Sequence, residues 1–263
     1  MAPNYEICAI RYGHVERTAR HNFLDGDEHD GPMPLDFYVW TIRGPGLTLV
    51  LDTGFDAAAA AARGRQLVQP VGAGLESVGV DPRQVKDVII SHMHYDHAGN
   101  HELFAQARYH LQTEEMAYCT GSAMCGDGAR WAYEASDVQA MVGRLYAGRL
   151  VYHDGTAELA PGITVHRVGG HTRGLQVVRV HTQRGWVVLA SDAAHFYANW
   201  QQRRAFPIVD DLAAYMAAFA TIEQLASSPL HVIPGHDPLV LQRYPAAATG
   251  LANAVRLDLA PHE

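Results

Sequence analysis

Histidines and an aspartate are concentrated in the stretch "SHMHYDHAG", residues 91–99, which holds three imidazoles and a carboxylate within six positions. His92 and His94 are two residues apart, so in an extended turn their side chains lean to the same side and can share one cation. Asp96 and His97 are adjacent and precede a segment that can start a helix, which directs them to a neighbouring position. The spacing therefore predicts two adjacent metal ions.

Each half of such a site needs further ligands, because a catalytic zinc ion takes three protein ligands and keeps one position open. Candidates follow along the chain: a histidine after the glycine pair in "GGHTRG", a histidine in "IPGHD" and an aspartate in "LASDA", whose carboxylate can bridge two ions. The predicted ligands are His92, His94 and His171 on one ion, Asp96, His97 and His236 on the other, and Asp192 between them.

The elements that must position these residues are strands that end at His or Asp. Examples are "LTLVLDTG", "WVVLASDA" and "HVIPGHD". Runs rich in β-branched and aromatic residues predict strands at 37–42, 47–52, 87–91, 108–111, 163–168, 175–180, 186–191 and 231–234. Capping residues and helical periodicity predict helices at 82–87, 113–119, 133–148, 211–227 and near 246–257. Strands that all stop at ligand-type residues indicate one sheet edge where an active site is built.

Composition limits the classes of function. The chain has 263 residues, 48% of them hydrophobic, which favours a single domain over residues 1–263. The net charge of −8 and the lack of a basic stripe argue against nucleic acid as a partner. No apolar stretch approaches a membrane span of about 20 residues, and the N-terminus resembles no secretory signal. We therefore expect a cytoplasmic enzyme with a small-molecule substrate, either monomeric or homodimeric.

The ordered set "SHMHYDHAG", "GGHT", "SDA" and "PGHD", with "LVLDTG" upstream, resembles the metallo-β-lactamase-fold hydrolase superfamily. The resemblance implies an α/β (α+β) protein with an αββα sandwich, and a dinuclear metal centre that is usually zinc, with manganese, cobalt or iron as substitutes. It implies hydrolysis by a metal-bound hydroxide, and it makes Asp52 the group that orients a metal-ligand histidine. Asp96 or Asp192 can then accept the proton of the nucleophile and pass it to the leaving group.

Within this superfamily, the bridging Asp192 and the full "HMHYDH" look similar to the N-acyl-homoserine lactonase branch, which implies opening of a lactone or cleavage of a related carboxylic ester. That branch usually carries a tyrosine three residues after the bridging aspartate. Here the position is His195, with Tyr197 two residues further on, and either can contact the substrate.

Four alternatives to a lactonase stay open, one of them other hydrolytic chemistry on the same scaffold, such as cleavage of an amide or ring opening of an aromatic catabolite. A thioesterase of the glyoxalase II kind is disfavoured because the C-terminal segment offers only Arg256 as a cation for an acidic thiol. A phosphodiesterase or nuclease is disfavoured by the acidic net charge. A metal- or ligand-binding module without catalysis would bind the ions but turn over no substrate.

Overall fold

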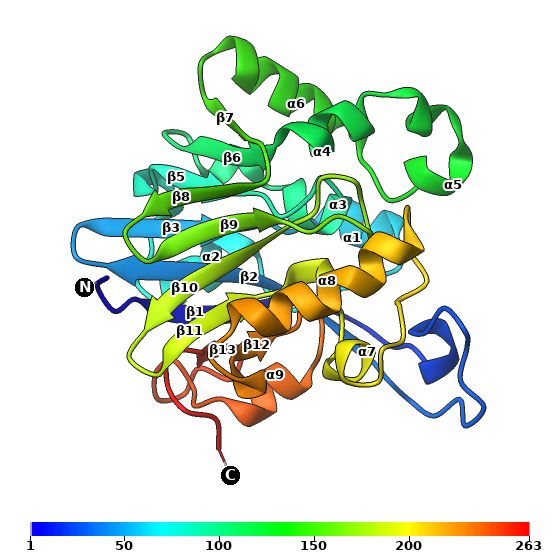
Figure 1. Cartoon of the computed structure of the whole chain (residues 1–263). Coiled ribbons are helices and arrows are strands. Elements are labelled where there is room, and N and C mark those ends of the chain that lie inside the picture. Colours follow the sequence, from blue (N-terminus) through cyan, green and yellow to red (C-terminus); the bar gives the residue numbers. More distant parts are fainter. Residues whose placement is uncertain (1, 263) are drawn as a thin grey trace.

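Two β-sheets packed face to face, with helices on their outer sides, make up the computed structural model, which describes residues 2–262 (Figure 1). The first sheet has the order β13-β1-β2-β3-β5-β6-β7, and β4 pairs with β1. Its strands are β1 (Glu6–Val15), β2 (Leu35–Gly44), β3 (Leu47–Leu51), β4 (Gln66–Leu67), β5 (Asp87–Ile89), β6 (Arg108–Gln112), β7 (Leu150–His153) and β13 (Ala254–Arg256).

The second sheet has the order β12-β11-β10-β9-β8. Its strands are β8 (Thr156–Ala160), β9 (Ile163–Arg167), β10 (Gln176–Thr182), β11 (Gly185–Leu189) and β12 (Val232–Ile233). This αββα arrangement confirms the predicted fold class.

Side chains that alternate between the two faces of a strand contribute to two separate hydrophobic cores. In β2, Tyr38, Trp40 and Ile42 point between the sheets, whereas Phe37 and Val39 belong to the core under the helices. Because successive side chains point to opposite faces of a strand, a strand covered on both faces must be apolar throughout. β3 and β11 are accordingly apolar over residues 49–51 and 186–189, and ligand-type residues follow their ends.

Helices cover the outer faces of both sheets. Figure 1 shows α8 lying across the second sheet, and α2 contacts β1 of the first. Aspartates cap two of them: Asp56 accepts a hydrogen bond from the N–H of Ala59, and Asp211 from that of Ala214. The helices are α1 (Ala57–Ala62), α2 (Val71–Ser77), α3 (Tyr95–Ala98), α4 (Thr113–Cys119), α5 (Asp127–Arg130), α6 (Ala135–Tyr146), α7 (Tyr197–Gln201), α8 (Leu212–Leu225) and α9 (Leu239–Arg243).

The eight predicted strands all appear, and α4, α6 and α8 confirm three predicted helices. The helix expected near 246–257 is wrong, because this segment ends in β13, whose Ala254–Arg256 pair antiparallel with residues 8–10 of β1. The segment at 82–87 forms only a short 3-10 helix over Pro82–Gln84. Within the described residues, no helix is long and apolar enough to cross a membrane.

Candidate metal centre

The predicted ligands meet at the edge of the sandwich where strands of both sheets end. His92 and His94 lie in the turn after β5, and Asp96 and His97 lie on the short helix α3 that follows. The second sheet contributes His171 between β9 and β10, Asp192 after β11 and His236 after β12. All seven side chains are buried.

One set of donor atoms surrounds a common point. The Nδ1 of His94 lies 3.0 Å from Nε2 of His92 and 3.0 Å from Nε2 of His171. Oδ2 of Asp192 lies 3.1 Å from Nε2 of His171 and 3.7 Å from Nε2 of His92. Donor atoms about 3.3 Å apart are expected around a tetrahedral ion with ligand distances near 2.0–2.1 Å. These four residues can therefore hold one ion.

A second set uses the other oxygen of Asp192. Its Oδ1 lies 2.9 Å from Nε2 of His236 and 3.2 Å from Nε2 of His97. Oδ2 of Asp96 lies 3.6 Å from Nε2 of His97 and 3.9 Å from Nε2 of His236. The carboxylate of Asp192 thus faces both sets at once, which is the arrangement of a bridging ligand.

Hydrogen bonds at the far side of each ring leave the inward nitrogen free to bind a metal. His171 Nδ1 donates to the carbonyl of Ile208 and His236 Nδ1 to that of Asp36, each at 2.8 Å. With the proton on Nδ1, the lone pair of each imidazole lies on Nε2, which faces a carboxylate oxygen of Asp192. Two acceptors held this close repel each other unless a cation lies between them. The residues present therefore fit a divalent metal.

The charges within the site also favour a cation. Burial alone would lower the pKa of His97, but the carboxylates of Asp192, Asp96 and Asp52 raise it well above its ordinary value. Nε2 of His97 is buried without a hydrogen-bond partner among the described residues. A bound metal ion would supply the positive charge that these carboxylates attract.

Asp52 holds the ring of His97 in place. It follows β3, and its Oδ2 accepts from His97 Nδ1 at 2.7 Å, while its Oδ1 accepts the backbone N–H of Ser91 at 2.7 Å. Because this bond occupies Nδ1, Nε2 of His97 is left to face Asp192 and Asp96, where it could bind an ion. The backbone of Asp52 has φ +61°, a left-handed conformation that the neighbouring strands β3 and β5 hold in place.

Comparison with known proteins agrees with this geometry. The sequence profile of the metallo-beta-lactamase superfamily matches residues 36–244. The chain belongs to this superfamily.

Two relatives of this chain are named N-acyl homoserine lactonase AiiB. The protein from Rhizobium rhizogenes is 31% identical over 225 residues, which cover 78% of this chain and 80% of the relative. The protein from Agrobacterium fabrum is 33% identical over 170 residues, and that match spans only 60% of the relative's length. A solved quorum-quenching N-acyl homoserine lactone lactonase superposes with a TM-score of 0.73 at 19% identity, covering 91% of this chain and 94% of that one, which shows the shared fold.

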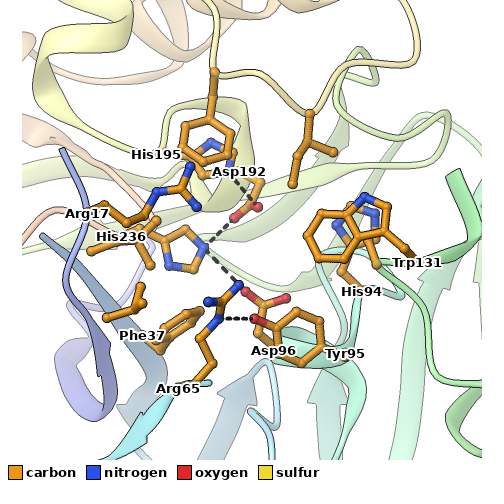
Figure 2. A pocket seen from close by; sticks show the side chains of 15 residues that line it. Arg17, Phe37, Arg65, His94, Tyr95, Asp96, Trp131, Asp192, His195 and His236 are labelled. Carbon is orange, nitrogen blue, oxygen red and sulfur yellow. Dashed lines mark hydrogen bonds and ion pairs between the residues drawn. The ribbon is translucent and has the colours of Figure 1, made fainter. Parts of the chain in front are cut away.

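A cavity opens over the predicted metal centre of this superfamily member. Asp96, Asp192, His195 and His236 lie in its wall, together with apolar side chains such as Phe37. Figure 2 shows His195 and His236 both directed at Asp192.

His195 and Tyr197 lie in different surroundings. The ring of His195 stacks on Phe206, with centroids 3.6 Å apart, and its Nε2 lies 3.0 Å from Asp192 Oδ2. Tyr197 is packed in the core between the sheets, with its ring under the guanidinium of Arg243, and it is not in the cavity wall. Of the two predicted substrate contacts, the structure therefore places only His195 at the cavity.

Glu115 is a positioning residue that the sequence did not reveal. This fully buried carboxylate on α4 accepts the N–H of Met93, between two predicted ligands, at 2.9 Å. It also accepts the hydroxyl of Thr172 at 2.6 Å and the N–H of Gly174 at 3.1 Å, both just after His171. Glu115 thereby ties together the two turns that carry three histidines. Its only signal in the sequence, "TEEMAYC", is that of an ordinary helix.

Proposed function

We propose that the protein is a metal-dependent hydrolase that opens a lactone, or cleaves a related carboxylic ester, of a small molecule. The observation that carries this proposal is the placement of Asp192, whose two oxygens face two separate sets of imidazole and carboxylate donors. The donors are mostly imidazoles, which favours zinc at both sites, with manganese, cobalt or iron as substitutes. When bound, two such ions would polarise the substrate carbonyl and lower the pKa of an attacking water.

Asp96 is suited to carry the proton of the reaction. Its Oδ2 faces the second donor set, whereas its Oδ1 makes no hydrogen bond within the described residues. A carboxylate that lies in the cavity wall and keeps one oxygen free can accept a proton from the nucleophile and deliver it to the leaving oxygen. Asp192, with both oxygens directed at donor sets, is proposed to position the ions.

His195 is proposed to contact the substrate. Burial lowers the pKa of its imidazole to about 3, so the ring is neutral at physiological pH and offers one N–H. Its Nε2 faces the cavity beside Asp192, and the hydroxyl of Tyr215 lies 3.3 Å from its Nδ1. An N–H on Nε2 lies 3.0 Å from Oδ2 of Asp192, and when that oxygen holds an ion the N–H can donate to the substrate oxygen instead, as the tyrosine of the lactonase branch would.

The lactone assignment is supported by the two relatives, which carry the name N-acyl homoserine lactonase. The bridging position of Asp192 supports the same branch. An acyl-homoserine lactone is one candidate, and the histidine at position 195 extends the candidates to other lactones and esters.

A substrate panel tests the proposal. Zinc-loaded protein is incubated with acyl-homoserine lactones, simple lactones, aryl esters, thioesters and phosphodiesters, and acid release is recorded. We expect turnover of lactones, and a loss of at least about a thousandfold in kcat/KM in Asp192→Asn, together with fewer bound ions. Near-normal rates in Asp192→Asn, or turnover of phosphodiesters alone, would contradict the proposal. Bound metal without turnover on any substrate would indicate a binding module.

A further inference from the structure

Two arginines lie in the wall of the cavity beside the predicted metal centre. Arg17 follows β1 and Arg65 precedes β4, and both are half-buried. The antiparallel pairing of these strands sets His14 opposite Gln66, so the same register brings Arg65 close to the residues just before Arg17. Figure 2 shows both side chains at the cavity, with Trp131 on its other side.

Neutral contacts hold the two guanidinium groups in place. Nε of Arg17 donates to Oδ1 of Asn22 at 2.8 Å, its Nη2 donates to the carbonyl of His21, and it lies over the ring of Phe206. Nε of Arg65 donates to the hydroxyl of Tyr95 at 3.0 Å. These contacts leave Nη1 of Arg17 and both Nη groups of Arg65 without an acceptor among residues 2–262.

Neither arginine forms an ion pair with a carboxylate in the described part of the chain. Neighbouring cations do: Arg63 lies 2.6 Å from Glu134, and Arg204 lies 3.0 Å from Asp25. Carboxylates are plentiful, because the chain has 28 acidic residues against 20 basic ones. The lack of a carboxylate partner for Arg17 and Arg65 among the described residues is therefore a feature of this cavity and does not follow from the composition of the chain.

The two charges lie close enough to disfavour each other. Burial and the neighbouring cation of Arg65 lower the pKa of Arg17. The carboxylates in the cavity wall, Asp96 and Asp192, face the predicted metal ligands instead. An anion bound between the two guanidinium groups would relieve their repulsion and satisfy the free Nη donors.

We propose that Arg17 and Arg65 bind an oxyanion, a carboxylate or a phosphate, on the part of the substrate away from the bond that is cleaved. The substrate class is then an anionic lactone or ester, whose apolar body packs against Phe37 and Trp131. This inference rests on the proposed function, because it names the substrate of the same site.

Matched substrates test the inference. The first pair is a γ-butyrolactone that carries a carboxylate on its γ-carbon and the neutral carboxamide of the same shape. A third lactone carries a phosphate ester on a methylene group attached to the γ-carbon and tells which oxyanion is preferred. With zinc-loaded wild-type protein we expect kcat/KM for the better anionic lactone to exceed that for the amide by about tenfold to a hundredfold.

Variants locate the preference. Arg17→Met and Arg65→Met should each lower the ratio of anionic to neutral kcat/KM by about tenfold, mainly through KM of the anionic substrate. Arg83→Met removes the same charge from an exposed side chain before β5, at the far end of the sheet, and should leave the ratio unchanged. The inference is overturned if the wild-type protein prefers the amide, or if neither cavity variant changes the ratio of anionic to neutral kcat/KM. Either result would leave the proposed hydrolase function standing.

A binding measurement keeps the inference testable if no lactone is turned over, which would refute the proposed function instead. Calorimetry compares a cyclopentanone carrying the same carboxylate or phosphate with its neutral amide, on zinc-loaded wild type and on both cavity variants. Tighter binding of an anionic ketone, lost in the variants, supports the anion site. Equal affinity for the anionic ketones and the amide refutes it.

Discussion

Asp192 shows how one side chain can organise two sites. Its carboxylate is buried, and burial alone would raise its pKa, but His195, His236, His97 and His171 lower that pKa well below its ordinary value. The group therefore stays ionised although its side chain is buried. An ionised carboxylate with lone pairs on both oxygens can face two donor sets, which a neutral amide cannot do.

His195 is a donor to the substrate in our proposal, yet its Nε2 also lies among the possible ligand atoms of Asp192 and His236. We expect His195→Ala to lower kcat by about a hundredfold while two zinc ions stay bound per chain, because one positioned donor contributes roughly that much. Activity and elemental analysis of the same sample measure both quantities.

A matched variant separates the two roles of this histidine. His195→Gln keeps an N–H donor and should recover part of the rate. If His195→Ala retains one zinc ion instead of two, the imidazole is a metal ligand, and its proposed role as a substrate donor is wrong.

At the scale of the elements, the site depends on the ends of five strands and on the contacts that hold those ends together. At two glycines in the turn that carries His171, the backbone lies directly against a neighbouring helix. Gly170 has φ +88°, and a Cβ there would lie 2.4 Å from the backbone of Tyr215 on α8. A Cβ on Gly174 would lie 2.1 Å from the backbone N of Glu115 on α4. The turn that carries His171 is therefore packed directly between two helices, and no larger residue fits there.

Glu115 is the carboxylate that accepts hydrogen bonds from the turns packed around it. In Glu115→Gln, an amide N–H₂ would replace one of the oxygens that now accept from Met93, Thr172 and Gly174. We expect the free energy of unfolding to fall by about 2–3 kcal/mol, because a buried charged hydrogen bond is lost and two donors then face each other. Zinc affinity should fall at the set that contains His92, His94 and His171. Glu114→Gln, on the exposed side of the same helix, is the control and should change neither quantity.

Denaturant titration and competition with a zinc chelator measure the two effects of Glu115→Gln. Loss of stability with unchanged zinc affinity would show that Glu115 supports the fold without positioning the ligands.

The whole molecule shows which features a sequence can predict. The meeting of the seven predicted ligands was predictable, because each follows an apolar strand and polar residues at strand ends gather at one sheet edge. Arg17 and Arg65 were not, because their approach depends on the pairing of β1 with β4, whose paired residues are about 50 positions apart. The C-terminal helix was wrongly predicted for a related reason: the alanines of "YPAAATGLANAV" favour a helix locally, but pairing with β1 decides the structure.

The predicted metal centre also joins the two sheets, because His92, His94, Asp96 and His97 come from the first sheet and His171, Asp192 and His236 from the second. Removing the ions should therefore destabilise the whole fold. At a free zinc concentration about a thousand times the Kd, one site adds about 4 kcal/mol of stability, which corresponds to a Tm shift of roughly 10 °C for a chain of this size. We expect chelated protein to melt at least that much lower than zinc-loaded protein in differential scanning calorimetry.

The pH dependence of this effect has a definite sign. Burial lowers the pKa of His92 and His94 well below 6.5 in the folded chain, so both rings are neutral and free to bind metal. The unfolded chain takes up protons on these histidines below about pH 6.5, so stability present above that pH is lost as the pH falls. Protons also compete with zinc for the same nitrogens, so the Tm difference between zinc-loaded and chelated protein should shrink from pH 7.5 towards pH 5. Adding zinc back to chelated protein at pH 7.5 should restore the Tm, whereas magnesium at the same concentration should not. An equal Tm with and without zinc would show that the predicted ligands form no metal site.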